Sequence, residues 1–184
     1  MVEPDEERDW IRKSQQGDLE AFEALVRRHQ RMIHSLTYRM TGSLPDAEDL
    51  AQDTFLQAFR QLSGYRAEAR FSTWVYRIAV NLCLNWKQRR NRQERLQADW
   101  SQNQAASRRS DSPALEQVQE ALLKLPPKQR AAVILTAYDG LNHAEAARIL
   151  GCSESTVSWR VFAARAHLKK LLANAQSGNL HHEE

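Results

Sequence analysis

Basic and aromatic residues are interleaved between Arg60 and Arg95. This stretch carries nine Lys and Arg side chains and two acidic ones, which gives it a formal charge of +7. Positive charge attracts a phosphate backbone, and flat rings stack on unpaired bases. The segment is therefore typical of a surface that holds a single strand of nucleic acid. The aromatic residues within it are Tyr65, Phe71, Trp74, Tyr76 and Trp86.

We assign to this surface the residues expected to face solvent. Asn81 and Asn85 are four residues apart, so on a helix they share a face from which both amides can hydrogen-bond base edges. Trp74 and Trp86 follow the apolar face instead and are expected to be core residues. The predicted contacts to a melted strand are Arg66, Arg70, Tyr76, Arg77, Asn81, Asn85, Lys87, Arg89 and Arg90.

A second nucleic-acid signal lies in residues 141 to 170. Asn142 and Glu145 form a capping pair for a short helix. Gly151 supplies a left-handed turn, after which Ser153 caps a longer helix. A short helix, a tight glycine turn and a longer helix predict a helix-turn-helix, although an ordinary helical hairpin with a solvated face is the alternative.

The outer face of this longer helix carries hydroxyl, basic and aromatic side chains. In a helix-turn-helix, such side chains reach phosphates and base edges in the major groove. The predicted contacts to duplex DNA are Ser155, Thr156, Ser158, Trp159, Arg160, Arg165 and Lys169.

An acidic helix face is predicted around residues 46 to 53. Its carboxylates would repel DNA, so the face is either simply solvated or a docking surface for a basic protein partner. The residues assigned to it are Asp46, Glu48, Asp49, Gln52 and Asp53.

Other chemistry finds no support in the sequence. The six histidines form no metal-ligand or catalytic-triad spacing, and there is no glycine-rich phosphate loop. Cys83 and Cys152 fall in apolar helical patterns and read as small core residues. We therefore expect no enzyme activity, no catalytic residues, no metal and no cofactor. The chain has no apolar run long enough to span a membrane and no signal peptide, which predicts a cytoplasmic protein.

The elements that position these residues are predicted to be helices throughout. Apolar residues recur at steps of three and four, and no strand-like alternation is present. The stretch from about 96 to 112 is rich in Gln, Asn, Ser and Arg and cannot bury a core. We predict an all-α chain with two small helical domains, 1–95 and 113–175, joined by a flexible linker over 96–112 and followed by a tail over 176–184.

Three motifs in order resemble the extracytoplasmic-function (ECF) group of the sigma-70 family of RNA polymerase sigma factors. DAEDLAQDTF at 46–55 resembles the polymerase-docking helix of that family. FSTWVYRIAVN at 71–81 resembles the segment that melts promoters and reads the minus-ten element. LPPKQR at 125–130, with the helix-turn-helix after it, resembles the region that reads the minus-thirty-five element.

The resemblance implies a mechanism and partners. The first domain is expected to bind the clamp of the β′ subunit of core RNA polymerase and to trap the unwound strand of promoter DNA. The second is expected to dock in the upstream major groove and to touch the β flap. The family also implies an anti-sigma factor, and the linker predicts several arrangements of the two domains in the free protein. A stand-alone helix-turn-helix regulator and a non-transcribing decoy of the sigma surface are the alternatives.

Overall fold

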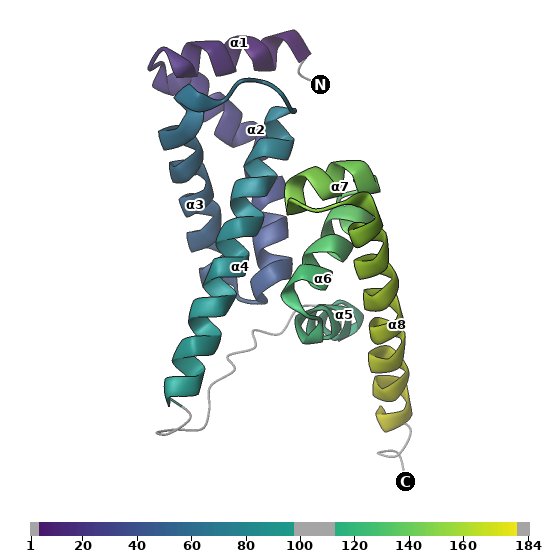
Figure 1. Ribbon diagram of the computed structural model, residues 1–184. Helices are drawn as coiled ribbons and strands as arrows, with labels where there is room; N and C mark the ends of the chain where they lie inside the picture. The colour runs from purple at the N-terminus through teal and green to yellow at the C-terminus, as the bar shows by residue number, and fades with distance from the viewer. Residues whose placement is uncertain (1–3, 98–112, 180–184) are drawn as a thin grey trace.

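The computed structural model describes residues 4–97 and 113–179, and both ranges are built from helices (Figure 1). The first range contains α1 Pro4–Gln15, α2 Leu19–Thr41, α3 Leu44–Gln61, a 3-10 turn Leu62–Gly64 and α4 Phe71–Gln97. The second contains α5 Pro113–Lys124, α6 Pro127–Val133, a π-helical turn Ile134–Tyr138, α7 His143–Leu150 and α8 Glu154–Asn179. The predicted all-α class is confirmed. The predicted linker lies outside the described residues, except for 96–97 at the end of α4.

In the first domain, α2, α3 and α4 lie side by side and α1 crosses one end of them. Asp18 caps α2 by accepting a hydrogen bond from the Ala21 amide at 3.0 Å, and Gly42 ends the helix with φ of 73°. Ser43 then caps α3 through the Asp46 amide at 3.4 Å. The chain reverses within two residues, so α2 and α3 pack as an antiparallel pair.

The short helix α1 was not predicted from the sequence. The Glu7 carboxylate lies 2.6 Å from Nε2 of the buried His29 in α2. Burial lowers the pKa of His29, and the hydrogen bond that the Glu7 carboxylate accepts only partly opposes that shift. From the end of α1, the Gln15 amide donates hydrogen bonds to the carbonyls of Leu62 and Tyr65, at 3.0 and 2.9 Å. α1 therefore fixes the turn that leads into α4.

In the second domain, α7 and α8 form the helix-turn-helix that the sequence predicts. Asn142 and Glu145 make a reciprocal capping box, with hydrogen bonds of 2.9 and 3.1 Å. Gly151 has the left-handed φ of 60°, and Ser153 accepts from the Thr156 amide at 3.2 Å. Val157, Val161 and Ala164 are buried, so one side of α8 is fixed against its own domain and the other is left outward.

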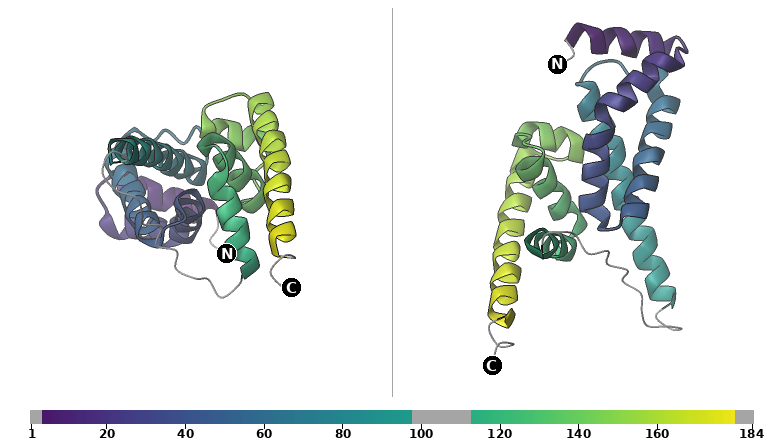
Figure 2. Two further views of the ribbon diagram at one scale, coloured as in Figure 1. Left: turned by 90° about the horizontal axis from the view of Figure 1, so that it is seen from below. Right: turned by 180° about the vertical axis from the view of Figure 1, so that it is seen from behind.

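The two domains pack against each other, as the views from below and from behind also show (Figure 2). α5 lies against α2, and α7 lies against α4. One apolar core runs from Leu25 and Val75 in the first domain to Leu135 and Ile149 in the second. The domains therefore share a core in this arrangement, where the sequence predicted two separate ones.

Some helix bounds differ from the predictions. α6 ends at Val133 and passes directly into the π-helical turn, a change of helix type that the sequence did not predict. α8 continues to Asn179, into the predicted tail, and α4 continues to Gln97, into the predicted linker. Fraying ends and single-turn changes of helix type leave little trace in a hydrophobic pattern, which explains these misses.

Candidate nucleic-acid and polymerase interfaces

The outward face of α4 carries a stripe of polar residues. Arg77, Asn81, Asn85 and Arg89 follow one another at intervals of four and are all exposed. Lys87, beside them, is half-buried. The structure thus brings most of the predicted strand-binding side chains onto one helix face.

Arg90 extends this polar surface toward α3. Its guanidinium lies 3.4 Å from the Asp46 carboxylate and 5.4 Å from the centre of the Trp86 ring. One residue of the predicted DNA surface is thus paired with one residue of the predicted docking helix.

A short loop before α4 presents Arg66 and Arg70, both exposed. The Tyr65 hydroxyl closes this loop by donating to the Ala69 carbonyl at 2.6 Å. The Tyr65 ring packs 5.8 Å from Phe71 and 5.0 Å from Trp74. An aromatic cluster therefore holds the loop, with Phe71 buried and the Tyr65 and Trp74 rings half-buried.

Tyr76 corrects the sequence prediction. It was assigned to the exposed strand-binding set, but only 4% of its surface is accessible. Its hydroxyl hydrogen-bonds the Asp139 carboxylate of the second domain, and burial raises its pKa. The apolar periodicity of α4 could not show this, because the residues that cover Tyr76 come from the far end of the chain.

The outer face of α8 is polar at its start and aromatic in its middle. Ser155, Ser158, Arg165 and Lys169 are exposed, as predicted, and Thr156 is half-buried. The half-buried Arg160 donates a hydrogen bond to the Cys152 sulfur at 3.4 Å, so it is turned partly toward the glycine turn.

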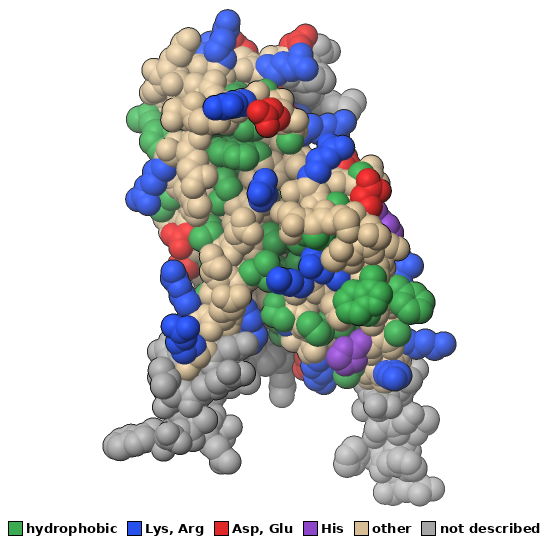
Figure 3. Space-filling view, in the orientation of Figure 1, with side chains coloured by type: hydrophobic (Ala, Val, Ile, Leu, Met, Phe, Trp, Pro, Cys, Tyr) green, Lys and Arg blue, Asp and Glu red, His purple; other side chains and the backbone are tan. Residues whose placement is uncertain are grey.

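Two aromatic rings project from α8 in the middle of this face. Trp159 is 62% exposed and Phe162 is 73% exposed. Figure 3 shows hydrophobic side chains standing out over α8 with Lys and Arg side chains nearby. The sequence reading missed Phe162, although its position three residues after Trp159 and seven after Ser155 places it on the same face.

The predicted acidic face on α3 is accessible. Glu48, Asp49, Gln52 and Asp53 are exposed, while Asp46 is half-buried and paired with Arg90. Leu56 and Phe59, one and two turns further on, are 48% and 41% exposed. The face is therefore acidic at its start and apolar at its end, a combination the sequence reading did not anticipate.

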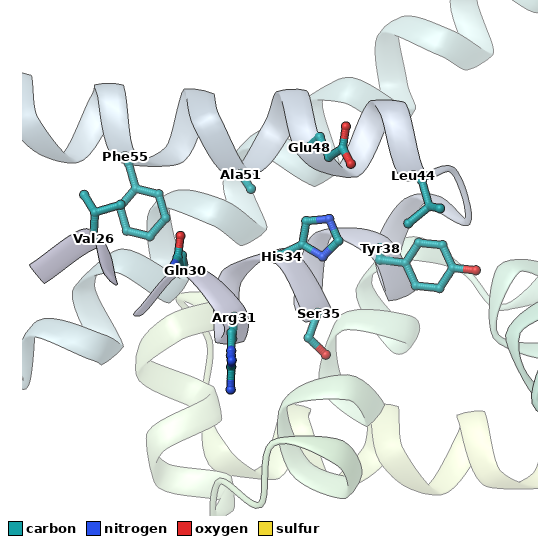
Figure 4. Close-up of a pocket in the computed structure, with 10 residues that line it drawn as sticks. All are labelled: Val26, Gln30, Arg31, His34, Ser35, Tyr38, Leu44, Glu48, Ala51 and Phe55. Carbon is teal, nitrogen blue, oxygen red and sulfur yellow. The ribbon is translucent and has the colours of Figure 1, made fainter. Parts of the chain in front are cut away.

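A groove of about 620 Å³ lies between the packed helices α2 and α3, beside the acidic face (Figure 4). Leu44, Ala51 and Phe55 line it from α3, and Val26 and Tyr38 line it from α2. Arg31, His34 and Glu48 add polar groups to the lining, and the His34 ring points from α2 toward α3. The groove therefore combines apolar and polar groups, as protein–protein interfaces do.

Among the residues the structure describes, no group of three or more His, Cys, Asp or Glu side chains is placed to hold a metal ion. In the same ranges, no helix combines the length and the apolar character that crossing a bilayer requires. The thiol of Cys83 is buried, which raises its pKa to about 12, so it is a packing residue rather than a nucleophile.

Together these features define a two-domain helical protein with a helix-turn-helix, a second basic helix and an accessible acidic helix. Comparison with known families identifies a group of proteins with these features. The model of sigma-70 region 2 matches residues 25–93, and that of sigma-70 region 4 matches residues 115–168. The chain therefore belongs to the sigma-70 family of RNA polymerase sigma factors, and its relatives place it in the ECF group.

Two of these relatives are ECF sigma factors from other bacteria. The chain is 38% identical to SigM of Mycobacterium tuberculosis, over 88% of its own length and 82% of the relative's. It is 31% identical to SigW of Bacillus subtilis, over 88% of its own length and 94% of the relative's.

Solved structures match across both domains. The sigma factor RpoE from Bartonella quintana, crystallised with the anti-sigma factor NepR, superposes with a TM-score of 0.71 at 25% identity, over 83% of this chain and 96% of that one. CnrH, in complex with the cytosolic domain of CnrY, gives a TM-score of 0.70 at 28% identity, over 92% and 98%.

Proposed function

We propose that this protein binds core RNA polymerase and directs it to promoters through the surfaces on α3, α4 and α8. The observation that carries the proposal is the coexistence of two basic, outward helix faces with one acidic face on a single chain. In this proposal the first domain spans 1–95 and the second 113–175, joined by the linker 96–112. The protein contributes recognition, while the chemistry of transcription belongs to the polymerase in the cytoplasm.

The docking surface for polymerase is the acidic face of α3. Glu48, Asp49, Gln52 and Asp53 offer exposed acceptors to a basic partner, and Asp46 borders them. The neighbouring groove between α2 and α3 supplies apolar area, so charge sets the orientation and burial adds affinity. The β′ clamp is the partner proposed for this face, and the β flap is proposed for the second domain.

The α4 stripe and the loop before it are proposed to hold the unwound strand at the minus-ten element. Arg66, Arg70, Arg77 and Arg89 face solvent and can neutralise phosphates. Asn81 and Asn85 lie between them and can read bases that have left the stack, at a cost of a few kcal/mol per base. Lys87 and Arg90 extend the surface, and Tyr76 is left out while the second domain covers it.

The outer face of α8 is proposed to read the minus-thirty-five element in the major groove. Ser155, Ser158 and Arg165 can reach base edges or phosphates, with Thr156, Arg160 and Lys169 at the sides. The exposed rings of Trp159 and Phe162 suit contact with the methyl groups of thymine.

An anti-sigma factor is the proposed regulator. Two solved relatives that match both domains were captured with proteins of this kind or with a cytosolic partner domain. Such an inhibitor can bind the groove between α2 and α3 and the exposed apolar residues of α3. This is the surface proposed to bind polymerase, so the two partners would compete. A stand-alone helix-turn-helix regulator is disfavoured, because it leaves the acidic helix and the α4 stripe without a role.

A charge reversal on α3 tests this function. Asp49→Arg is expected to weaken binding to core polymerase by at least about tenfold, since it places a cation against a basic partner surface. Glu120→Arg on α5, another exposed acidic residue, is the matched control and should leave affinity unchanged. Affinity is measured beside a thermal melt of each variant. Equal affinities for both folded variants would remove α3 from the docking surface.

A further inference from the structure

The C-terminal end of α2 is capped by side chains of the second domain. The last carbonyls of a helix lack partners within the helix and carry partial negative charge. Gln119 of α5 donates hydrogen bonds to the carbonyls of Tyr38 and Arg39, at 3.3 and 3.4 Å. Arg130 of α6 donates to the Met40 carbonyl at 2.5 Å. The second domain therefore completes the end of a helix in the first.

Arg130 joins two helix ends. Its remaining donors reach the carbonyls of Leu122, at 2.8 Å, Leu123, and Leu125, at 3.1 Å, all at the end of α5. The residue is 2% exposed, and within the described ranges its guanidinium donates hydrogen bonds to backbone carbonyls alone. A buried cation is costly without compensation, and here the negative ends of α5 and α2 supply it together. When the domains separate, Arg130 loses the compensating hydrogen bond from its guanidinium to the end of α2.

Other contacts surround this cap. The Arg39 guanidinium lies 4.6 Å from the centre of the Tyr138 ring. The Leu123 side chain lies directly over Gly42, so a side chain at position 42 would collide with Leu123. The Tyr76 hydroxyl bonds to Asp139. Polar and apolar contacts thus hold the domains together across α2 and α4.

This arrangement is too compact to read a promoter. α7 contacts both α4 and α8, and packed helix axes lie about 8–10 Å apart, so the two DNA-reading helices are separated by only about 20 Å. The minus-ten and minus-thirty-five elements are about 25 base pairs apart, or about 85 Å at 3.4 Å per base pair. The domains must separate before both elements can be bound at once.

We propose that Gln119 and Arg130, seated on the end of α2, form a latch that keeps the free protein closed and limits its access to polymerase. The latch is part of the chain itself and acts without an inhibitor. It replaces the expectation of several domain arrangements with one dominant arrangement in the free protein. Its effect on polymerase rests on the function proposed above, whereas the closed shape does not.

The test is a carboxylate placed against the α2 carbonyls. In Gln119→Glu the new carboxylate faces the negative end of α2. It cannot donate the hydrogen bonds that the amide gives to the α2 carbonyls, and its charge is repelled by them, so the two domains should separate. Gln117→Glu makes the same change two residues away on the exposed side of α5 and is the control. Small-angle scattering of the full chain should show a larger radius of gyration for Gln119→Glu alone.

Affinity for core polymerase supplies the second readout. The α3 face is exposed in the closed form, but tight binding requires the two domains to engage the β′ clamp and the β flap at the same time, and only the open form allows this. Gln119→Glu should therefore bind about three- to tenfold more tightly than wild type and Gln117→Glu. Equal radii of gyration for all three proteins would overturn the latch. Opening without a gain in affinity would overturn its inhibitory role. Wild type and both variants failing to bind polymerase would refute the proposed function and the inhibitory role with it, while the scattering result would still decide the closed shape.

Discussion

The two helices proposed to read DNA use aromatic residues in opposite ways. On α4 and in the loop before it, Phe71 and Tyr76 are buried, and Trp74 packs against Phe71 at 5.6 Å. On α8, Trp159 and Phe162 are mostly exposed. α4 is a central helix of its domain, and its aromatic rings pack in the core. α8 is anchored by small residues, so its aromatic rings are exposed and can contact a ligand. Aromatic content alone therefore does not locate a nucleic-acid surface.

The largest expected difference between the two helices is in stability. Phe71→Ala should lower the free energy of unfolding by about 3–5 kcal/mol, because it empties a buried site within an aromatic cluster. Phe162→Ala removes an exposed ring and should change it by less than about 0.5 kcal/mol. Urea denaturation of both variants makes the measurement. A large loss for Phe162→Ala would mean that the α8 ring is structural and that the contrast is false.

The next effect is on binding to duplex DNA. Phe162→Ala and Arg165→Ala should each weaken binding to a minus-thirty-five duplex by about 1–3 kcal/mol if the side chain reads a base. His167→Ala, at an exposed position two residues beyond Arg165, serves as the control. Fluorescence anisotropy with specific and scrambled duplexes separates base reading from phosphate contact. Loss on neither duplex would remove this face from the interface.

A smaller and less sequence-dependent effect is expected on α4. Arg77→Ala should weaken binding of the polymerase complex to a melted minus-ten strand alike for all sequences. The dependence of log affinity on log salt should fall by about 0.7, the value for one phosphate contact on a single strand. Asn81→Ala should instead alter base preference with the salt dependence unchanged. If both variants behave identically, the assignment of phosphate contact to Arg77 and base reading to Asn81 is wrong.

The smallest effect concerns pH and the buried ring of α4. Burial raises the pKa of Asp139 to about 6, against partial opposition from Tyr76 on α4 and Arg39 on α2. Because the closed state holds this proton more tightly than an exposed carboxyl would, closing is favoured as pH falls through about 6 and loses this contribution as pH rises above it.

Scattering at pH 5.5 and 7.5 checks this sign. Wild type should be more compact at the lower pH, and Asp139→Asn should lose that dependence because its amide does not titrate. An equal response in both proteins would assign the pH dependence to other groups. One Asp139 oxygen is buried without a hydrogen-bond partner within the described residues, which agrees with a group that favours protonation.

Most of the helices could be predicted from the sequence because the signals that define them are local. Helix periodicity, the capping box at Asn142 and Glu145, and the glycine turn at Gly151 each act within a few residues, and all three were predicted correctly. The resemblance to sigma factors rested on three such local motifs. The acidic face of α3 and most of the α4 and α8 surface residues were placed on exposed faces for the same reason.

What the sequence could not give depends on contacts between distant segments. Tyr76 fits a solvent-facing pattern until Asp139, from the other domain, covers it. Arg130 entered the sequence analysis only as the last residue of the motif LPPKQR, and the structure shows it buried between the ends of α5 and α2. Helix α1 lacks an apolar run, and polar contacts from Glu7 and Gln15 to residues far along the chain help to hold it. No periodicity within one segment encodes such pairings.

Run-off transcription with core polymerase on a pool of randomised promoters tests the central claim most directly. The account predicts transcripts that start at defined positions on templates enriched for two shared elements, one about ten and one about thirty-five base pairs upstream of the start, as the function proposed for α4 and α8 requires. Arg165→Ala should reduce enrichment of the upstream element alone. Transcription no different from that of core polymerase without the protein would contradict the account.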